Sequence, residues 1–201
     1  MIIFINFLVR ENRKVFNKII NLKSMIDIKP EWYSLSPKDK VERCELFDRS
    51  VAQDLLQRVF KDHAHNIKWH ATSADTDMDM TVTGSNHDIE VKELMKMGYD
   101  NTYCIKKNKV EKMDYEGVYI VLNPVLGKAY IYDFSTMDWG KTWTHFCNEK
   151  RIQMDEHSPI RRVEMYQLPI ELATEYDISD LVAKYQHIKM RDYNADTTTT
   201  K

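Results

Sequence analysis

Apolar residues recur every three to four positions over residues 36–60, which is the spacing of one face of an α-helix. Ser36 is a suitable N-cap, Pro37 fits the first helical position, and Asp39 lies in the first turn. The apolar positions of this stretch are Val41, Cys44, Phe47, Val51, Leu55 and Val59. Glu45 projects along the flank of this stripe, either at its edge or turned inward for a purpose. We therefore predict a long amphipathic helix here.

Strict alternation of apolar and polar residues follows in two short segments and predicts a β-hairpin. The segments are residues 77–83 and 89–92, and the turn residues Gly-Ser-Asn-His lie between them. If Thr83 pairs with Asp88, the apolar side chains form one face, with Met80 opposite Val91 and Val82 opposite Ile89. The other face then collects Asp77, Asp79, Glu90 and Lys92. A slip by one residue would mix the faces, so the pattern favours this alternation.

The remaining segments extend the alternation of helices and strands. A short basic helix is predicted over residues 106–113. Residues 118–122 form a continuous apolar, β-branched run, as expected of a strand that is buried on both faces. A further strand is predicted over residues 129–134, and one or two closing helices within residues 171–189. This order predicts the α/β fold class.

The chain reads as one domain with extensions at both ends. With five glycines and five prolines in 201 residues, no stretch resembles an interdomain linker. We predict an N-terminal helical appendage over residues 1–25, a domain over residues 26–190 and a flexible tail over residues 191–201. The apolar start is much shorter than the ~20 residues that span a bilayer, so no stable membrane association is expected. Whether the appendage packs on the domain, lies on a membrane surface or precedes a true start at Met25 stays open.

The composition indicates the cellular compartment of the protein more clearly than its function. The net charge of −2 argues against tight non-specific DNA binding through bulk positive charge. Three widely spaced cysteines without a CxxC pair argue against a zinc ribbon, and their odd number favours a reducing, cytoplasmic setting.

Two carboxylates and a lysine on one face of the predicted hairpin could together bind a metal ion and act on a phosphate. Asp79 and Glu90 offer the hard oxygen ligands that Mg²⁺ prefers, together with water and phosphate oxygens. Lys92, two residues after Glu90 and on the same face, can orient a metal-activated water or offset charge in a transition state. Exposed charges on an open sheet are the plainer interpretation. A charged cluster beside a strand covered on both faces is costly, however, unless it is paired or holds a metal.

Asp79, followed after ten residues by Glu90-Val91-Lys92, resembles the core motif of the PD-(D/E)XK nuclease superfamily. In that motif an acidic residue ends one strand, a short hairpin follows, and (D/E)-X-K lies on the next strand. The resemblance covers about residues 38–134, including the preceding helix and the basic segment at residues 104–113. No proline precedes Asp79, and the second aspartate, Asp77, leaves the choice of acid open.

The resemblance implies a restriction-endonuclease-like core, in which helices flank a central mixed β-sheet. It implies hydrolysis of DNA phosphodiester bonds with Mg²⁺ or Mn²⁺. Asp79 and Glu90 would bind the metal, Asp77 and Glu45 would assist, and Lys92 would act in catalysis. Two lysines of the basic segment, Lys106 and Lys109, are predicted to contact the DNA backbone.

The family's range leaves the substrate open. It includes restriction enzymes, junction resolvases, repair and recombination exonucleases and phage enzymes, and nothing in the residues chooses among them. Cleavage of both strands of a duplex would call for a symmetric homodimer. The alternative function is a non-catalytic nucleic-acid-binding or nuclease-inhibiting protein on the same fold.

Other candidate groups favour plainer interpretations. His63, His65 and His70 could bind a metal, but solvated histidines in a polar loop are the better interpretation. Trp139 and Trp143 could stack on bases, although a core or interface role is the simpler one.

Overall fold

The longest element is the helix α3, Pro37–Phe60, which begins where the sequence predicts. In the computed structural model the described residues are 26–61, 67–69, 80–82, 88–94, 101–149 and 161–193. The Ser36 hydroxyl oxygen accepts a hydrogen bond from the Asp39 amide at 3.1 Å, which confirms the predicted N-cap. The buried face of α3 comprises Phe47, Val51, Ala52, Leu55 and Leu56.

A mixed sheet forms the centre of the described part of the chain. Its strand order is β10-β7-β6-β4-β3-β2. The strands are β2 (Ile67–Trp69), β3 (Met80–Val82), β4 (Asp88–Glu93), β6 (Val118–Asn123), β7 (Lys128–Asp133) and β10 (Thr174–Asp177). β4 and β6 are parallel, and the other neighbours are antiparallel. The prediction that residues 118–122 are covered on both faces is confirmed, because all but the first of them are buried. The α/β class is therefore confirmed.

The pairing of β3 with β4 differs from the predicted register. Met80 is opposite Ile89 and Thr81 is opposite Asp88, so the predicted pairing of Met80 with Val91 is wrong by two residues. Because side chains alternate with a period of two, a shift of two residues leaves the β4 side chains on their predicted faces.

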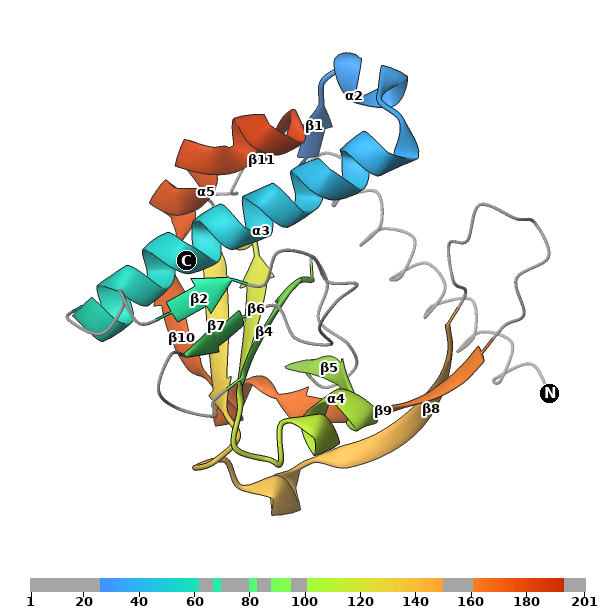
Figure 1. Cartoon of the computed structure of the whole chain (residues 1–201), viewed down its shortest axis with the longest axis vertical. Helices are drawn as coiled ribbons and strands as arrows, with labels where there is room; N and C mark the ends of the chain where they lie inside the picture. Colours follow the sequence, from blue (N-terminus) through green and yellow to red (C-terminus); the bar gives the residue numbers. More distant parts are fainter. Residues whose placement is uncertain are drawn as a thin grey trace, which may run out of the picture.

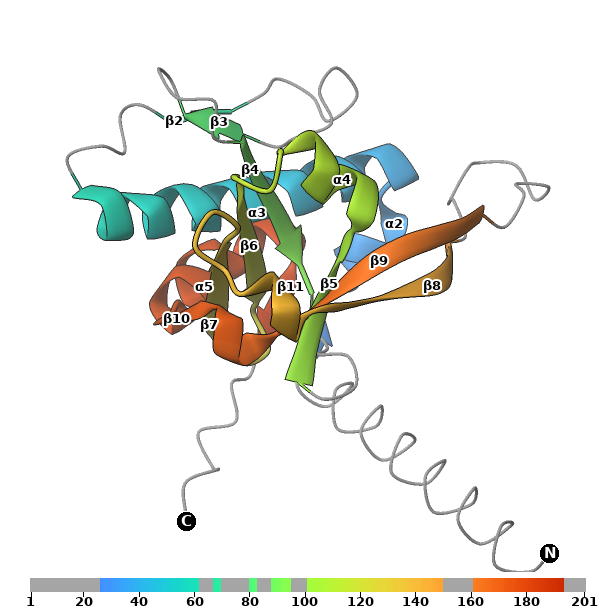
Figure 2. The same cartoon turned by 90° about the horizontal axis from the view of Figure 1, so that it is seen from below.

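A second, three-stranded antiparallel sheet was not predicted from the sequence. It has the order β5-β9-β8, with β5 at Thr102–Lys106, β8 at Trp143–Glu149 and β9 at Arg161–Pro169. Strands β8 and β9 extend well away from the central sheet (Figures 1 and 2). The short helix α4, Lys107–Lys112, follows β5 directly, close to the predicted basic helix. A turn of 3₁₀ helix, η3, at Trp139–Lys141 precedes β8.

The C-terminal region closes the fold with α5 (Ser179–Tyr185) and two 3₁₀ turns, η4 (Ile170–Leu172) and η5 (Gln186–Lys189). A strand, β11 at Arg191–Tyr193, then pairs with β1 at Ile26–Ile28. A described strand therefore lies beyond the predicted domain boundary at residue 190. The short helix α2, Glu31–Ser34, connects β1 to α3.

Two apolar cores cover the two faces of the central sheet. One lies between the sheet and the helices α3 and α5, and α3 crosses this face in Figure 1. The other lies between the opposite face of the sheet and the elements β5, β9 and α4. The central sheet therefore separates an α-helical layer from a layer that contains the second sheet.

No helix among the described residues is long and apolar enough to cross a membrane.

Candidate functional site

A cavity of about 240 Å³ lies where the central sheet, β5 and α4 meet. The described residues that line it are Glu90, Lys92, Leu94, Cys104, Ile105, Lys106, Lys109, Tyr119 and Met165. Glu90, Lys92, Lys106 and Lys109 are residues that the sequence indicated as functional, and three separate elements bring them together. The volume is below the roughly 300–1,000 Å³ of ordinary small-molecule pockets. It suits a small anionic group better than a large ligand.

Strand β4 points Glu90 and Lys92 into this cavity because successive side chains of a strand face opposite ways. Ile89 and Val91 face the other side and are buried in the core beneath α3. Glu90 is only 5% exposed, whereas the side chain of Lys92 is exposed. The carboxylate is therefore the deeper of the two cavity groups.

The buried carboxylate of Glu90 forms a salt bridge with Lys109 of α4. Their side chains are 7% and 25% exposed, respectively. A carboxylate this deeply buried is costly without a compensating charge. Because α4 begins directly after β5, the junction of these two elements determines where Lys109 meets Glu90.

The cavity carries positive charge in an acidic protein. The described lining residues include three lysines and one glutamate, although the whole chain has a net charge of −2. A concave site of one sign concentrates counter-ions of the other sign. The electrostatics therefore favour an anionic ligand.

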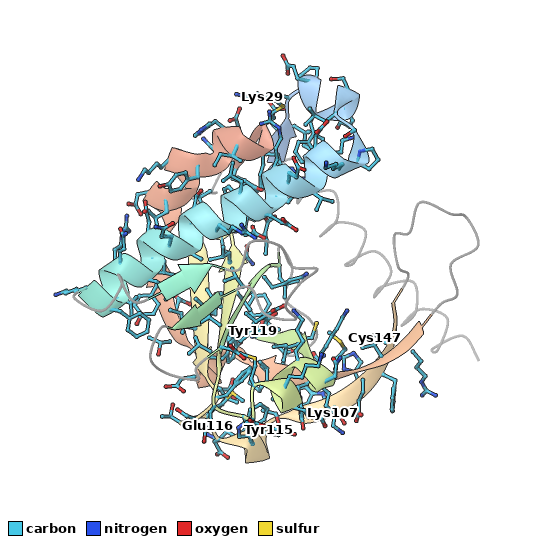
Figure 3. The ribbon with its side chains drawn as sticks, in the orientation of Figure 1. Lys29, Lys107, Tyr115, Glu116, Tyr119 and Cys147 are labelled. Atoms are coloured by element: carbon cyan, nitrogen blue, oxygen red, sulfur yellow. The ribbon has the colours of Figure 1, made fainter. Side chains whose placement is uncertain are left out.

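The cysteine that lines the cavity, Cys104, is not suited to act as a thiolate. Burial raises the pKa of the Cys104 thiol, and the neighbouring Cys147 raises it further, while Lys92 opposes the shift. A thiol in such surroundings stays protonated and is a poor nucleophile. The Tyr119 hydroxyl donates a hydrogen bond to the Cys104 carbonyl oxygen at 3.0 Å and so joins β6 of the central sheet to β5. Tyr119 is labelled in Figure 3. Both residues therefore shape the cavity wall.

A second buried group of charges lies on the other face of β4, beneath α3. Lys189 of η5 is 2% exposed, forms a salt bridge with Glu93 and lies 4.8 Å from the centre of the Phe47 ring. Asp48 of α3 is hydrogen-bonded to Glu93. Burial, followed by the negative charge of Glu93, raises the pKa of Asp48 to about 8. Both effects favour the protonated form of the Asp48 carboxyl group.

Several predicted site residues do not line the cavity or fall outside the described residues. Glu45 is a half-buried residue of α3 and is not among the described lining residues. Asp77 and Asp79 lie outside the described residues, and their predicted roles stay predictions. The histidines of the polar loop, His63, His65 and His70, also lie outside them.

The donor chemistry of the cavity is compatible with a divalent cation but incomplete in the described residues. Glu90 supplies one carboxylate, and Mg²⁺ is commonly bound by one or two carboxylates together with water and phosphate oxygens. Within the described ranges, no group of three or more histidine, cysteine, aspartate or glutamate residues could hold a metal. Among the described lining residues, Glu90 is therefore the one carboxylate that the cavity offers to a cation.

The sequence interpretation missed the part of the cavity wall that β9 contributes. Met165 of β9 lines the cavity, and Gln167 of the same strand is hydrogen-bonded to His145 of β8 at 2.9 Å. The alternation of Tyr166 and Leu168 with Met165 and Gln167 is a strand signal that could have indicated β9. Nothing local indicates that this strand lies beside Glu90.

The chain has no significant match to a protein-family model, to a curated protein or to a solved structure.

Proposed function

We propose that this protein is a metal-dependent nuclease of the PD-(D/E)XK type that hydrolyses DNA phosphodiester bonds with Mg²⁺ or Mn²⁺. One observation carries the proposal: Glu90 and Lys92 project from the same face of β4 into a cavity that also contains Lys106 and Lys109. A buried carboxylate beside several lysines suits a site where a cation and a phosphate meet.

The order of elements supports the same proposal. The helix α3 is followed by the antiparallel strands β2, β3 and β4, then by β5 and α4, and then by β6 parallel to β4. The sequence motif implies a helix, a hairpin that carries the acid and the Glu-Val-Lys triplet, and a basic segment before the next strand. The helix, the strand that carries the triplet and the basic segment have counterparts in that order, whereas the acid lies outside the described residues.

The proposal gives each cavity residue a role. Glu90 and Asp79 would hold the cation, which neutralises phosphate charge and lowers the pKa of a water molecule when bound. Lys92 would orient the attacking water and offset the negative charge that develops at phosphorus. Lys106 and Lys109 would contact phosphate oxygens on either side of the reacting group.

The position that we propose for Asp79 is inferred from the pairing of β3 with β4. Asp79 is bonded to Met80, and Met80 is opposite Ile89, the residue before Glu90. The proposal requires this antiparallel pairing to continue by one residue, which would set Asp79 opposite Glu90. The alternation that precedes Met80 in the sequence supports this continuation.

Metal-dependent cleavage tests the proposal. The protein is incubated with circular single-stranded, supercoiled and branched DNA in Mg²⁺, Mn²⁺ or EDTA, beside Lys92→Ala, Glu90→Gln and Asp79→Asn. We expect cleavage that needs the metal and falls by at least about 100-fold in each variant, because each removes a group that acts at the transition state.

Lys107→Ala is the matched control. Lys107 belongs to the same basic segment but pairs with Glu164 at 3.1 Å and is not among the described lining residues. We expect near-normal cleavage from this variant. A folded wild-type protein that cuts none of these DNAs in Mn²⁺ would contradict the nuclease proposal and favour a non-catalytic nucleic-acid-binding or nuclease-inhibiting protein.

A further inference from the structure

One face of the three-stranded sheet β5-β9-β8 begins at the cavity and continues beyond it. Lys106 of β5 is opposite Met165 of β9, and Met165 is opposite His145 of β8. Lys106 and Met165 both line the cavity. Because directly paired residues of neighbouring strands point to the same face, His145 lies on the cavity face, two strands beyond Lys106.

Trp143 shares this face. It is opposite Gln167 of β9, which is in turn opposite Cys104, another lining residue. Trp143 is 44% exposed. The two tryptophans of the region therefore differ in exposure, because Trp139 is half-buried and packs against the Phe134 and Tyr166 rings.

A buried polar chain fixes the orientation of His145. The Thr102 hydroxyl donates to the Gln167 side-chain oxygen at 2.7 Å, and the Gln167 amide nitrogen lies 2.9 Å from His145 Nδ1. Thr102 and Gln167 are 0% and 9% exposed, whereas His145 is exposed. With its oxygen bonded to Thr102, Gln167 donates to His145 Nδ1, so the imidazole carries its proton on Nε2. An exposed histidine is thus held as an oriented Nε2–H donor.

The hydrogen-bond donors of this face suit the phosphates of a nucleic-acid backbone. Over residues 102–106, 143–147 and 163–167, the residues on the cavity face include Lys106 and His145 and no acidic side chain. The acidic residue of these segments, Glu164, pairs with Lys107 on the opposite face. Figure 3 labels Cys147, which shares the cavity face, and Lys107 on different sides of this sheet.

We infer that the cavity face of the sheet β5-β9-β8 binds a single-stranded portion of the DNA substrate beside the cleavage site, an inference that rests on the proposed function. Lys106 and His145 contact phosphates, and Trp143 stacks on a base. An aromatic platform next to basic groups is the arrangement by which proteins hold single strands without reading their sequence. A base inside a duplex is already stacked on its neighbours, so this face selects unpaired strands.

Fluorescence anisotropy with a labelled single-stranded oligonucleotide and a blunt duplex of the same sequence, both in EDTA, tests this inference. We expect the wild-type protein to prefer the single strand, and Trp143→Ala to weaken that binding by about tenfold or more. His145→Ala weakens it severalfold. Gln167→Leu gives a similar loss, and the His145→Ala/Gln167→Leu double variant is no weaker than His145→Ala, because Gln167 acts through His145.

Phe146→Ala is the matched control, since Phe146 is a more exposed aromatic of the same strand, at 55%, and pairs with Glu164 on the opposite face. Single-strand binding by Trp143→Ala and His145→Ala equal to that of Phe146→Ala would overturn the inference. A wild-type preference for the blunt duplex would also overturn it. Because binding in EDTA requires no metal chemistry, a folded wild-type protein that cuts none of the DNAs leaves this test valid. The two proposals can therefore fail separately.

Discussion

Asp48 shows how one buried carboxyl group makes the stability of the fold depend on pH. Burial, and then the negative charge of Glu93, raises its pKa to about 8, against which Lys189 acts. Its Oδ1 atom has no hydrogen-bond partner among the described residues. Between the ordinary aspartate pKa near 4 and about 8, the folded protein holds a proton that the unfolded chain has lost. The free energy of unfolding therefore falls as pH rises through this window.

Asp48→Asn should remove this dependence. We expect the variant to be more stable than the wild-type protein by on the order of 5 kcal/mol at alkaline pH, because the amide cannot ionise and each unit of pKa difference is worth about 1.4 kcal/mol. Urea denaturation at a series of pH values from mildly acidic to alkaline measures the difference. Parallel curves for the two proteins across the series would show that Asp48 does not carry the proton.

At the scale of elements, β4 serves two environments because its side chains alternate. Glu90 and Lys92 face the cavity, whereas Ile89, Val91 and Glu93 face α3. The two-residue difference between the predicted and observed pairing with β3 changes neither face, since the period of a strand is two. Which residues face the cavity was therefore easier to predict than which residues are opposite one another.

The contact between α4 and β4 leads to a prediction about metal binding. Lys109→Ala leaves the Glu90 carboxylate buried without its salt-bridge partner, which we expect to lower the free energy of unfolding by roughly 1–3 kcal/mol. If a cation binds at Glu90, added Mg²⁺ or Mn²⁺ should raise the melting temperature of Lys109→Ala more than that of the wild-type protein. The cation would then supply the charge that Lys109 no longer supplies.

Thermal melting in EDTA and in each metal measures both effects. Lys107→Ala serves as the control, because its partner Glu164 is 30% exposed and water can replace the lost contact. We expect this variant to melt like the wild-type protein in both conditions. Equal metal-induced shifts in Lys109→Ala and the wild-type protein would exclude Glu90 as a cation ligand that competes with Lys109.

At the scale of the whole molecule, three distant segments meet in the charged group beneath α3. Lys189, near the end of the described chain, is buried against Glu93 and the Phe47 ring. The chain continues from there into β11, which pairs with β1. This group therefore ties the C-terminal region to the same strand that carries the cavity residues.

Lys189→Met should test the strength of this connection. Methionine keeps apolar contact with Phe47 but leaves Glu93 without its cation, and breaking a buried ion pair from one side costs about 3–5 kcal/mol. Chemical denaturation measures the loss. Lys184→Met is the control, since Lys184 is 58% exposed in its salt bridge with Asp54, and we expect little change. Equal stability of the two variants would show that the buried pair does not support the fold.

By itself, the sequence determined the features that depend on local spacing. The capped helix α3, the two faces of β4, the basic segment at α4 and the buried strand β6 all follow from periodicity and capping residues within a few positions of each other. These features were sufficient to predict an α/β fold and to select Glu90, Lys92, Lys106 and Lys109.

Only the tertiary structure decided which of these groups meet. The pairing of β9 with β5, the salt bridge of Lys109 with Glu90, and the burial of Lys189 against Glu93 each join residues that are far apart in sequence. Such contacts depend on packing between elements, and no local pattern of apolar and polar residues encodes them. The same physics explains why His145 and Asp48 gained significance only in the fold: partners from other strands and helices determine their orientation and protonation.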